Sequence, residues 1–150
     1  MTKVEMDIDT KLQPDRVVAA LTDFSERRTD IWPGLSPEYY EVYSVGDTWA
    51  EVREGNVKPF RTWAKERYDW SMPGKVTWTV NESNFCKPGS SVSADITPVD
   101  GGGSHVHITW ERFPSNMKGR FAAAVIKMTK GGPIPKSVKK VLDGLAETPA

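Results

Sequence analysis

One carboxylate of the chain stands where it could act as a general acid or base. Glu66 belongs to an expected strand, residues 60–70, and shares its face with Tyr68. The other members of this face are Phe60, Thr62, Ala64 and Trp70. If the face is turned inward, burial raises the pKa of Glu66 and suits it to acid–base chemistry, so Glu66 and Tyr68 are candidate catalytic residues. Two alternatives stay open: the face with Trp63 is the inward one, or Glu66 forms an internal ion pair, for example with Arg112.

A second polar group contains both histidines of the chain. His105 and His107 alternate along an expected strand, residues 105–113, with Glu111 on the same face. Two imidazoles and a carboxylate can bind zinc or iron. The opposite face carries Val106, Ile108 and Trp110, which indicates that the histidines point to water. We therefore predict no metal site, and nothing in the sequence indicates another cofactor.

The elements that position these residues follow an informative order. Alternating apolar residues predict a first strand at residues 4–8, and Pro14 begins a helix with apolar residues at helical spacing. Ser25 can cap a second short helix that runs towards Trp32. Period-two patterns bounded by turn residues then predict six strands. These strands are residues 39–45, 48–54, 60–70, 75–81, 91–99 and 105–113.

A final helix follows the strands. Ser115 is the expected N-cap, and Met117, Phe121, Val125 and Met128 form one apolar stripe at helical spacing. Residues 131–135, Gly-Gly-Pro-Ile-Pro, must break this helix. A second amphipathic piece follows at residues 138–145.

This order predicts an α+β fold in which a curved antiparallel sheet of six to seven strands wraps around the C-terminal helix. One domain over residues 1–150 is expected, with a frayed tail at 146–150. Such a sheet encloses more space than one helix about 10–12 Å across can fill, so large side chains or a ligand must occupy the remainder. Either the aromatic and methionine side chains pack a dry core, or they line a cavity. The candidate ligand-binding residues are Trp32, Tyr39, Tyr43, Tyr68, Trp78, Trp110, Arg112, Met117, Phe121, Val125 and Met128.

The order of elements and one motif carry a family resemblance. With Pro14-x-x-Val17-x-x-x-Leu21-Thr22-Asp23-Phe24 after the first strand, the chain resembles the START-like superfamily. That group includes the plant pathogenesis-related allergens and the bacterial polyketide cyclase/dehydratase family, and the latter is the most similar. The resemblance implies a helix-grip fold with a hydrophobic ligand cavity between sheet and helix, but no single reaction. The family's last helix is usually unbroken, whereas residues 131–135 interrupt this one.

Composition narrows the class of protein. The 150 residues have zero net charge, one cysteine and no apolar run near the roughly 20 residues of a membrane span. The first residues show no secretory signal, so a cytoplasmic location is expected. Charge is uneven, because residues 115–150 hold seven Lys/Arg and two Asp/Glu. This basic end could face an anionic partner or membrane, although a solvated helix face that complements the helix dipole is the simpler interpretation.

Three functions remain, all for a monomer or homodimer. The first is binding of a small hydrophobic molecule, lipid-like or aromatic, in the cavity. The second is an enzyme of the polyketide cyclase/dehydratase type with Glu66 and Tyr68 as its acid–base residues. The third is a protein-interaction module that uses the basic end. Nucleic-acid binding is not expected, because aromatic and basic residues do not interleave on one face.

Overall fold

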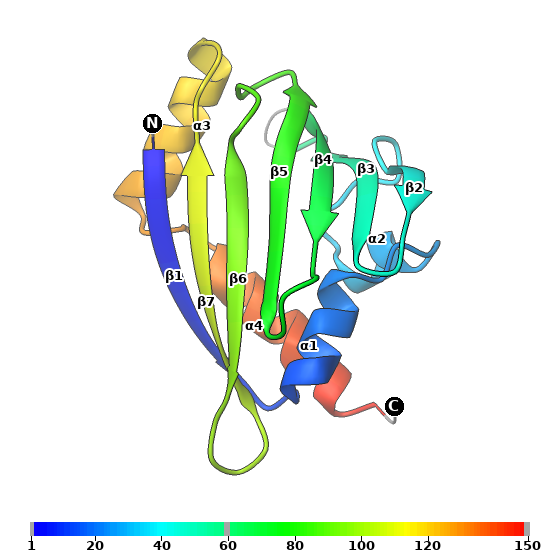
Figure 1. Cartoon of the computed structure of the whole chain (residues 1–150). Coiled ribbons are helices and arrows are strands. Elements are labelled where there is room, and N and C mark those ends of the chain that lie inside the picture. Colours follow the sequence, from blue (N-terminus) through cyan, green and yellow to red (C-terminus); the bar gives the residue numbers. More distant parts are fainter. Residues whose placement is uncertain (1, 59–60, 149–150) are drawn as a thin grey trace.

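The computed structural model describes residues 2–58 and 61–148, which form a seven-stranded antiparallel sheet and four helices (Figure 1). The sheet order is β1-β7-β6-β5-β4-β3-β2, so the first and last strands of the chain are neighbours. The strands are β1 (Thr2–Thr10), β2 (Glu41–Val45), β3 (Trp49–Asn56), β4 (Thr62–Asp69), β5 (Lys75–Ser83), β6 (Ser91–Pro98) and β7 (Ser104–Arg112). Phe60, the expected start of the fourth strand, lies outside the described residues, as do residues 149–150 of the expected frayed tail.

Four helices accompany the sheet. α1 (Pro14–Leu21) and α2 (Arg28–Ile31) follow β1, and α3 (Met117–Met128) and α4 (Ile134–Ala146) end the chain. In Figure 1, α4 runs diagonally behind the sheet, and α1 lies near the C-terminal part of α4. The helix α3 lies near the start of β1 and the end of β7. The predicted α+β helix-grip fold is confirmed, and none of the helices in the described part is long and apolar enough to cross a bilayer.

The strands show the inside–outside alternation that the sequence predicted. On β4, the inward side chains belong to Ala64, Glu66 and Tyr68, which are 4%, 5% and 3% exposed. Glu66 therefore lies on the buried face. A register shift between Lys65 and Glu66 in the β4–β5 pairing does not change this alternation.

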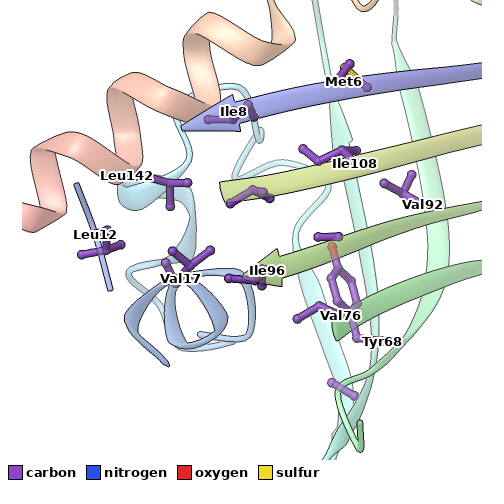
Figure 2. Close-up of a cluster of buried hydrophobic side chains, with 14 of the residues drawn as sticks. Met6, Ile8, Leu12, Val17, Tyr68, Val76, Val92, Ile96, Ile108 and Leu142 are labelled. Carbon is purple, nitrogen blue, oxygen red and sulfur yellow. The ribbon is translucent and has the colours of Figure 1, made fainter. Parts of the chain in front are cut away.

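The core occupies part of the space between the inner face of the sheet and the helices α1 and α4. Figure 2 shows Leu142 of α4 and Val17 of α1 close to Ile8 and Ile96 of the sheet. Leu142 and Val17 are 1% and 0% exposed. Each fully buried aliphatic side chain of this kind contributes about 1.5–3 kcal/mol to folding. These contacts hold α4 against the sheet.

The break at residues 131–135 is present, and it gives the two final helices different roles. Gly131 has a φ of 98° and packs so tightly on β1 that an added Cβ would lie 2.5 Å from the sulfur of Met6. This left-handed backbone ends the helical region and redirects the chain into α4. The N-cap of α3 is Asn116, not Ser115 as expected, because the Asn116 Oδ1 accepts a hydrogen bond from the Gly119 N–H at 2.8 Å.

The apolar stripe of α3 faces outward, contrary to expectation. Met117, Phe121, Val125 and Met128 are 76%, 58%, 42% and 84% exposed. The opposite face carries buried Gly119 and Ala123. Gly119 lies so close to the Phe85 backbone that an added Cβ would be 2.0 Å from the Phe85 carbonyl oxygen. Small residues permit this approach, so α3 packs through its small face and α4 is the helix gripped by the sheet.

Candidate functional site

A cavity of about 510 Å³ lies between the inner face of the sheet and the helices α1 and α4. Its walls are mainly apolar and aromatic, with contributions from strands far apart in the sequence. Wall residues include Met6, Leu21, Trp32, Ala64, Trp78, Phe85, Val92, Ile108, Trp110, Ile134, Val138 and Val141. The exposed lining residues Pro33, Gly34, Asn56 and Pro133 mark an opening between the loop after α2, the end of β3 and the start of α4. A cavity of this size and composition suits a small apolar ligand.

The first polar group in the wall is a closed network of Arg28, Glu54 and Tyr68. Arg28 Nε donates to Glu54 Oε2 at 2.6 Å, and Arg28 Nη2 donates to the Tyr68 hydroxyl at 3.1 Å. The Tyr68 hydroxyl donates its own proton to Glu54 Oε1. Arg28 Nη1 also donates to the carbonyl oxygens of Leu21 and Asp23 at 3.0 Å each. These bonds tie the region around α2 to β3 and β4.

This network leaves Tyr68 poorly suited to proton transfer. Burial raises the pKa of Tyr68 well above its ordinary value of 10.0, and the negative charge of Glu54 acts in the same direction. The ring of Tyr68 stacks on Trp78 with centroids 5.1 Å apart and meets the edge of Phe24 at 4.8 Å. The geometry therefore makes Tyr68 a part of the cavity wall whose hydroxyl proton is already committed to Glu54.

The second polar group is the pair of Glu66 on β4 and Arg112 at the end of β7. Their closest atoms, Arg112 Nη2 and Glu66 Oε2, are 3.9 Å apart, an ion-pair distance without a hydrogen bond. Among the described residues, Glu66 Oε2, Arg112 Nε and Arg112 Nη1 are buried without any hydrogen-bond partner. The Arg112 guanidinium lies 5.5 Å from the ring centre of Trp110 and 5.8 Å from that of Phe85. The pair thus faces the cavity with unused hydrogen-bonding capacity.

The surroundings of Glu66 change its acidity. Burial raises the pKa of Glu66 from 4.5 to about 8, against the opposing positive charge of Arg112. Near neutral pH the carboxyl group is therefore mostly protonated and can donate a hydrogen bond. Glu66 and Arg112 together present donors to any acceptor oxygen that enters the cavity, and Glu66 is poised to exchange a proton near neutral pH.

The structure brings some predicted site residues together and separates others. Glu66, Tyr68, Trp32, Trp78, Trp110 and Arg112 all line the cavity. Tyr39 and Tyr43 do not: Tyr39 is half-buried before the edge strand β2, and all five residues of β2, including Tyr43, are exposed. The expectation that Met117, Phe121, Val125 and Met128 line the cavity is also wrong, because α3 turns this stripe away from the sheet.

Two polar wall residues, Arg28 and Glu54, were not anticipated. A signal for Glu54 exists, because it continues the period-two face of Ala50 and Val52, both 0% exposed. No local pattern identifies Arg28, whose helix α2 spans only four residues. The pairing of these two residues depends on a tertiary contact between α2 and β3.

The histidines lie on the outer face of β7, as predicted. Each bridges acidic residues of β1: His105 contacts Asp9 at 2.8 Å and Asp7 at 2.9 Å, and His107 contacts Asp7 at 2.8 Å and Glu5 at 3.3 Å. Among the residues that the structure describes, no cluster of histidine, cysteine or carboxylate side chains has the arrangement of a metal site. The histidine–carboxylate ladder is therefore a surface feature, separate from the cavity.

Solved structures with the same fold cover nearly the whole chain. A START superfamily protein from Mycobacterium smegmatis has 9% identity and a TM-score of 0.73, with 98% of each chain covered. The Zhui aromatase/cyclase from Streptomyces sp. R1128 has 17% identity and a TM-score of 0.75, covering 97% of this chain and 93% of its own. A truncated norcoclaurine synthase from Thalictrum flavum has 11% identity and a TM-score of 0.71, covering 99% of this chain and 94% of its own. At these identities the likeness concerns the fold.

Sequence comparison adds one finding. The family model described as "Polyketide cyclase / dehydrase and lipid transport" matches residues 1–148. No curated protein sequence is significantly similar to the chain.

Proposed function

Because the chain belongs to the polyketide cyclase / dehydrase and lipid transport family, we propose that its cavity binds a small apolar molecule, lipid-like or aromatic, that carries an acceptor oxygen at Glu66 and Arg112. The apolar walls supply the binding energy, at about 25 cal/mol for each Å² of apolar surface removed from water, before the costs of ordering the ligand. The two polar side chains orient the ligand.

The observation that carries this proposal is the pair of buried donors on Arg112 without partners. A buried polar group without a hydrogen bond costs about 1–3 kcal/mol, and more when it is charged. A carboxylate or ketone oxygen beside Arg112 would remove this cost, and the protonated Glu66 would donate to the same group. A hydrocarbon without oxygen would leave the cost in place. The ligand should therefore have an oxygen at one end of an apolar body.

Calorimetric titration with three matched probes tests the proposal. Dodecanoic acid should bind more tightly than its methyl ester, and dodecylamine should bind most weakly because its cation meets Arg112. Arg112→Met should reduce the preference for dodecanoic acid over its methyl ester by at least about tenfold, which is the scale of one charge-assisted hydrogen bond. Arg27→Met, at a guanidinium 77% exposed, is the matched control and should leave the order unchanged. Equal affinity for the acid and the amine would contradict the proposal.

A second function, a cyclase/dehydratase reaction, is favoured by the raised pKa of Glu66 beside Arg112. A poly-β-keto chain would place one ketone oxygen at Arg112. As the α-carbon of the enol of a second unit attacks that carbonyl carbon and a C–C bond forms, Glu66 would give its proton to the resulting alkoxide, and its carboxylate would take the proton of the enol oxygen. In the elimination, Glu66 would give its proton to the hydroxyl group, which leaves as water, and the Glu66 carboxylate would remove the remaining α-proton as the C=C bond forms.

Glu66→Gln distinguishes the binder from the enzyme. With a synthetic poly-β-ketone, the enzyme hypothesis predicts a product lighter by one water in the mass spectrum of the wild-type reaction. Glu66→Gln should keep probe binding and lose turnover. Turnover that is equal in wild type and Glu66→Gln would show that Glu66 has no part in the mechanism. Binding without any turnover in the wild type would contradict the enzyme hypothesis and leave ligand binding as the only function.

A further inference from the structure

The outward face of α3 is unusual for a helix at a protein surface, because its largest side chains are apolar and exposed. Met117 and Met128, near the two ends of the helix, are 76% and 84% exposed, and Val125 between them is 42% exposed. Phe121 belongs to the same stripe and is 58% exposed. The buried side of the helix packs through the small residues Gly119 and Ala123 and through the half-buried Ile126. Met117 and Met128 therefore have most of their surface exposed.

Cations flank this stripe on both sides. At about 100° per residue, Arg120 and Lys127 lie along one edge of the stripe and Lys118 lies along the other. Lys130 extends the positive charge beyond the C-terminus of the helix. The sequence contains no Asp or Glu from residue 115 to residue 142, while the same segment contains seven Lys or Arg. The face is thus apolar at its centre and exclusively positive at its edges.

We propose that α3 is a docking helix for anionic phospholipid bilayers, with the methionines and Val125 in the headgroup–acyl boundary and the flanking cations at lipid phosphates and carboxylates. An interfacial helix requires this arrangement of an apolar stripe between basic edges. Each cation near an anionic surface adds to the attraction. α3 lies at one end of the sheet, beside the start of β1 and the end of β7 (Figure 1).

The position of α3 links this surface to the cavity. Gly119 packs on the backbone of Phe85, and Phe85 lines the cavity. The segment after α3 leads directly to Pro133, which lies at the cavity opening. A docked α3 would hold this opening near the lipid surface, from which an apolar ligand can enter. The docking proposal itself does not depend on the identity of the ligand.

Vesicle co-sedimentation of the full chain tests the proposal. The protein should bind phosphatidylcholine vesicles that contain phosphatidylserine, bind pure phosphatidylcholine much less, and lose binding when salt is raised. Met117→Glu/Met128→Glu and Arg120→Glu/Lys127→Glu should each reduce the apparent affinity by at least about tenfold. Because these side chains are exposed, all variants should keep the wild-type unfolding temperature.

Matched controls lie at the opposite end of the sheet. Met72, 64% exposed in the turn between β4 and β5, supplies Met72→Glu, and Lys11→Glu/Lys75→Glu repeats the double charge reversal there. Both controls should bind vesicles like the wild type. No binding to phosphatidylserine vesicles, or equal losses in α3 and control variants, would overturn the proposal. Binding to soluble polyglutamate without binding to vesicles would also overturn it and assign the face to an acidic protein partner.

Discussion

Arg112 Nη2 and Glu66 Oε2 lie 3.9 Å apart at the cavity, an ion-pair distance that is too long for a hydrogen bond. Two strands, β5 and β6, separate the strands that carry them, so the curvature of the sheet brings them together. By contrast, Arg28 and Glu54 in the same cavity wall bond to each other, and each also bonds to Tyr68. One pair thus stabilises the wall, and the other has capacity left for a ligand.

The affinity for an anionic ligand should fall as pH rises through the pKa of Glu66. The pKa of Glu66 is raised to about 8. Below this pH the Glu66 carboxyl group is neutral and leaves Arg112 available to the ligand. Above this pH the Glu66 carboxylate neutralises Arg112 and repels an anion. Calorimetric titration with dodecanoic acid from about pH 7 to about pH 9 should show a Kd that increases. Glu66→Gln should remove most of this change. Parallel pH profiles for the two proteins would show that another group is responsible.

Stability should depend on the same ionisation. A carboxyl group with a raised pKa binds its proton more tightly in the folded state, so its contribution is complete below the unfolded pKa near 4.5 and is lost as pH rises towards about 8. The free energy of unfolding should decrease by up to about 1.4 kcal/mol per pH unit in this window. Urea unfolding of wild type and Glu66→Gln should show that the relative stability of the variant is greatest above this window. A constant difference at all pH values would contradict the burial of an ionisable Glu66.

The closed network predicts strong coupling between Arg28 and Glu54. Arg28→Met leaves the Glu54 carboxylate buried without its partner, which should cost about 3–5 kcal/mol of stability, and the double variant Arg28→Met/Glu54→Leu should recover most of that loss. As a control, Arg67→Met breaks an ion pair with Glu51 at the surface, where the two side chains are 45% and 44% exposed. This change should cost less than about 1 kcal/mol of stability. Additive losses in the double variant would show that the two residues do not act as a pair.

The histidine ladder should titrate above the ordinary imidazole range. Hydrogen bonds to Asp9 and Asp7 raise the pKa of His105 above 6.5, and bonds to Asp7 and Glu5 raise that of His107. In NMR titrations, Asp7→Asn should lower both values, whereas Asp9→Asn should lower His105 alone. If Asp7→Asn left either histidine unchanged, the shared contact would be absent in solution.

Much of the fold could be predicted because period-two patterns fix which side chains share a face. The pattern around Glu66 worked in this way, since Ala64 and Tyr68 are buried beside it. The partners of the histidines could not be predicted from local patterns. Asp7 and Asp9 lie opposite His107 and His105 only because β1 pairs with β7, and this pairing joins the first and last strands of the chain.

The orientation of α3 was predicted wrongly for a related reason. Helical spacing shows that one face is apolar, but it does not show which neighbour covers that face. Here Gly119 and Ala123 allow the opposite face to approach the backbone of Phe85, and α4 takes the place on the sheet through residues such as Leu142. The spacing of the small residues Gly119 and Ala123, four apart, was the available signal for the buried face of α3. The stripe of large apolar residues on the opposite face was the stronger pattern and indicated the wrong face.

Native mass spectrometry of the purified protein and of Arg112→Met, each before and after addition of dodecanoic acid, tests ligand binding beside Arg112 most directly. We expect a one-to-one complex for the wild type, either with a copurified apolar molecule that contains oxygen or with the added acid, and a much weaker complex for Arg112→Met. A wild-type protein that remains free of ligand after addition, or an equally stable complex in Arg112→Met, would contradict this expectation.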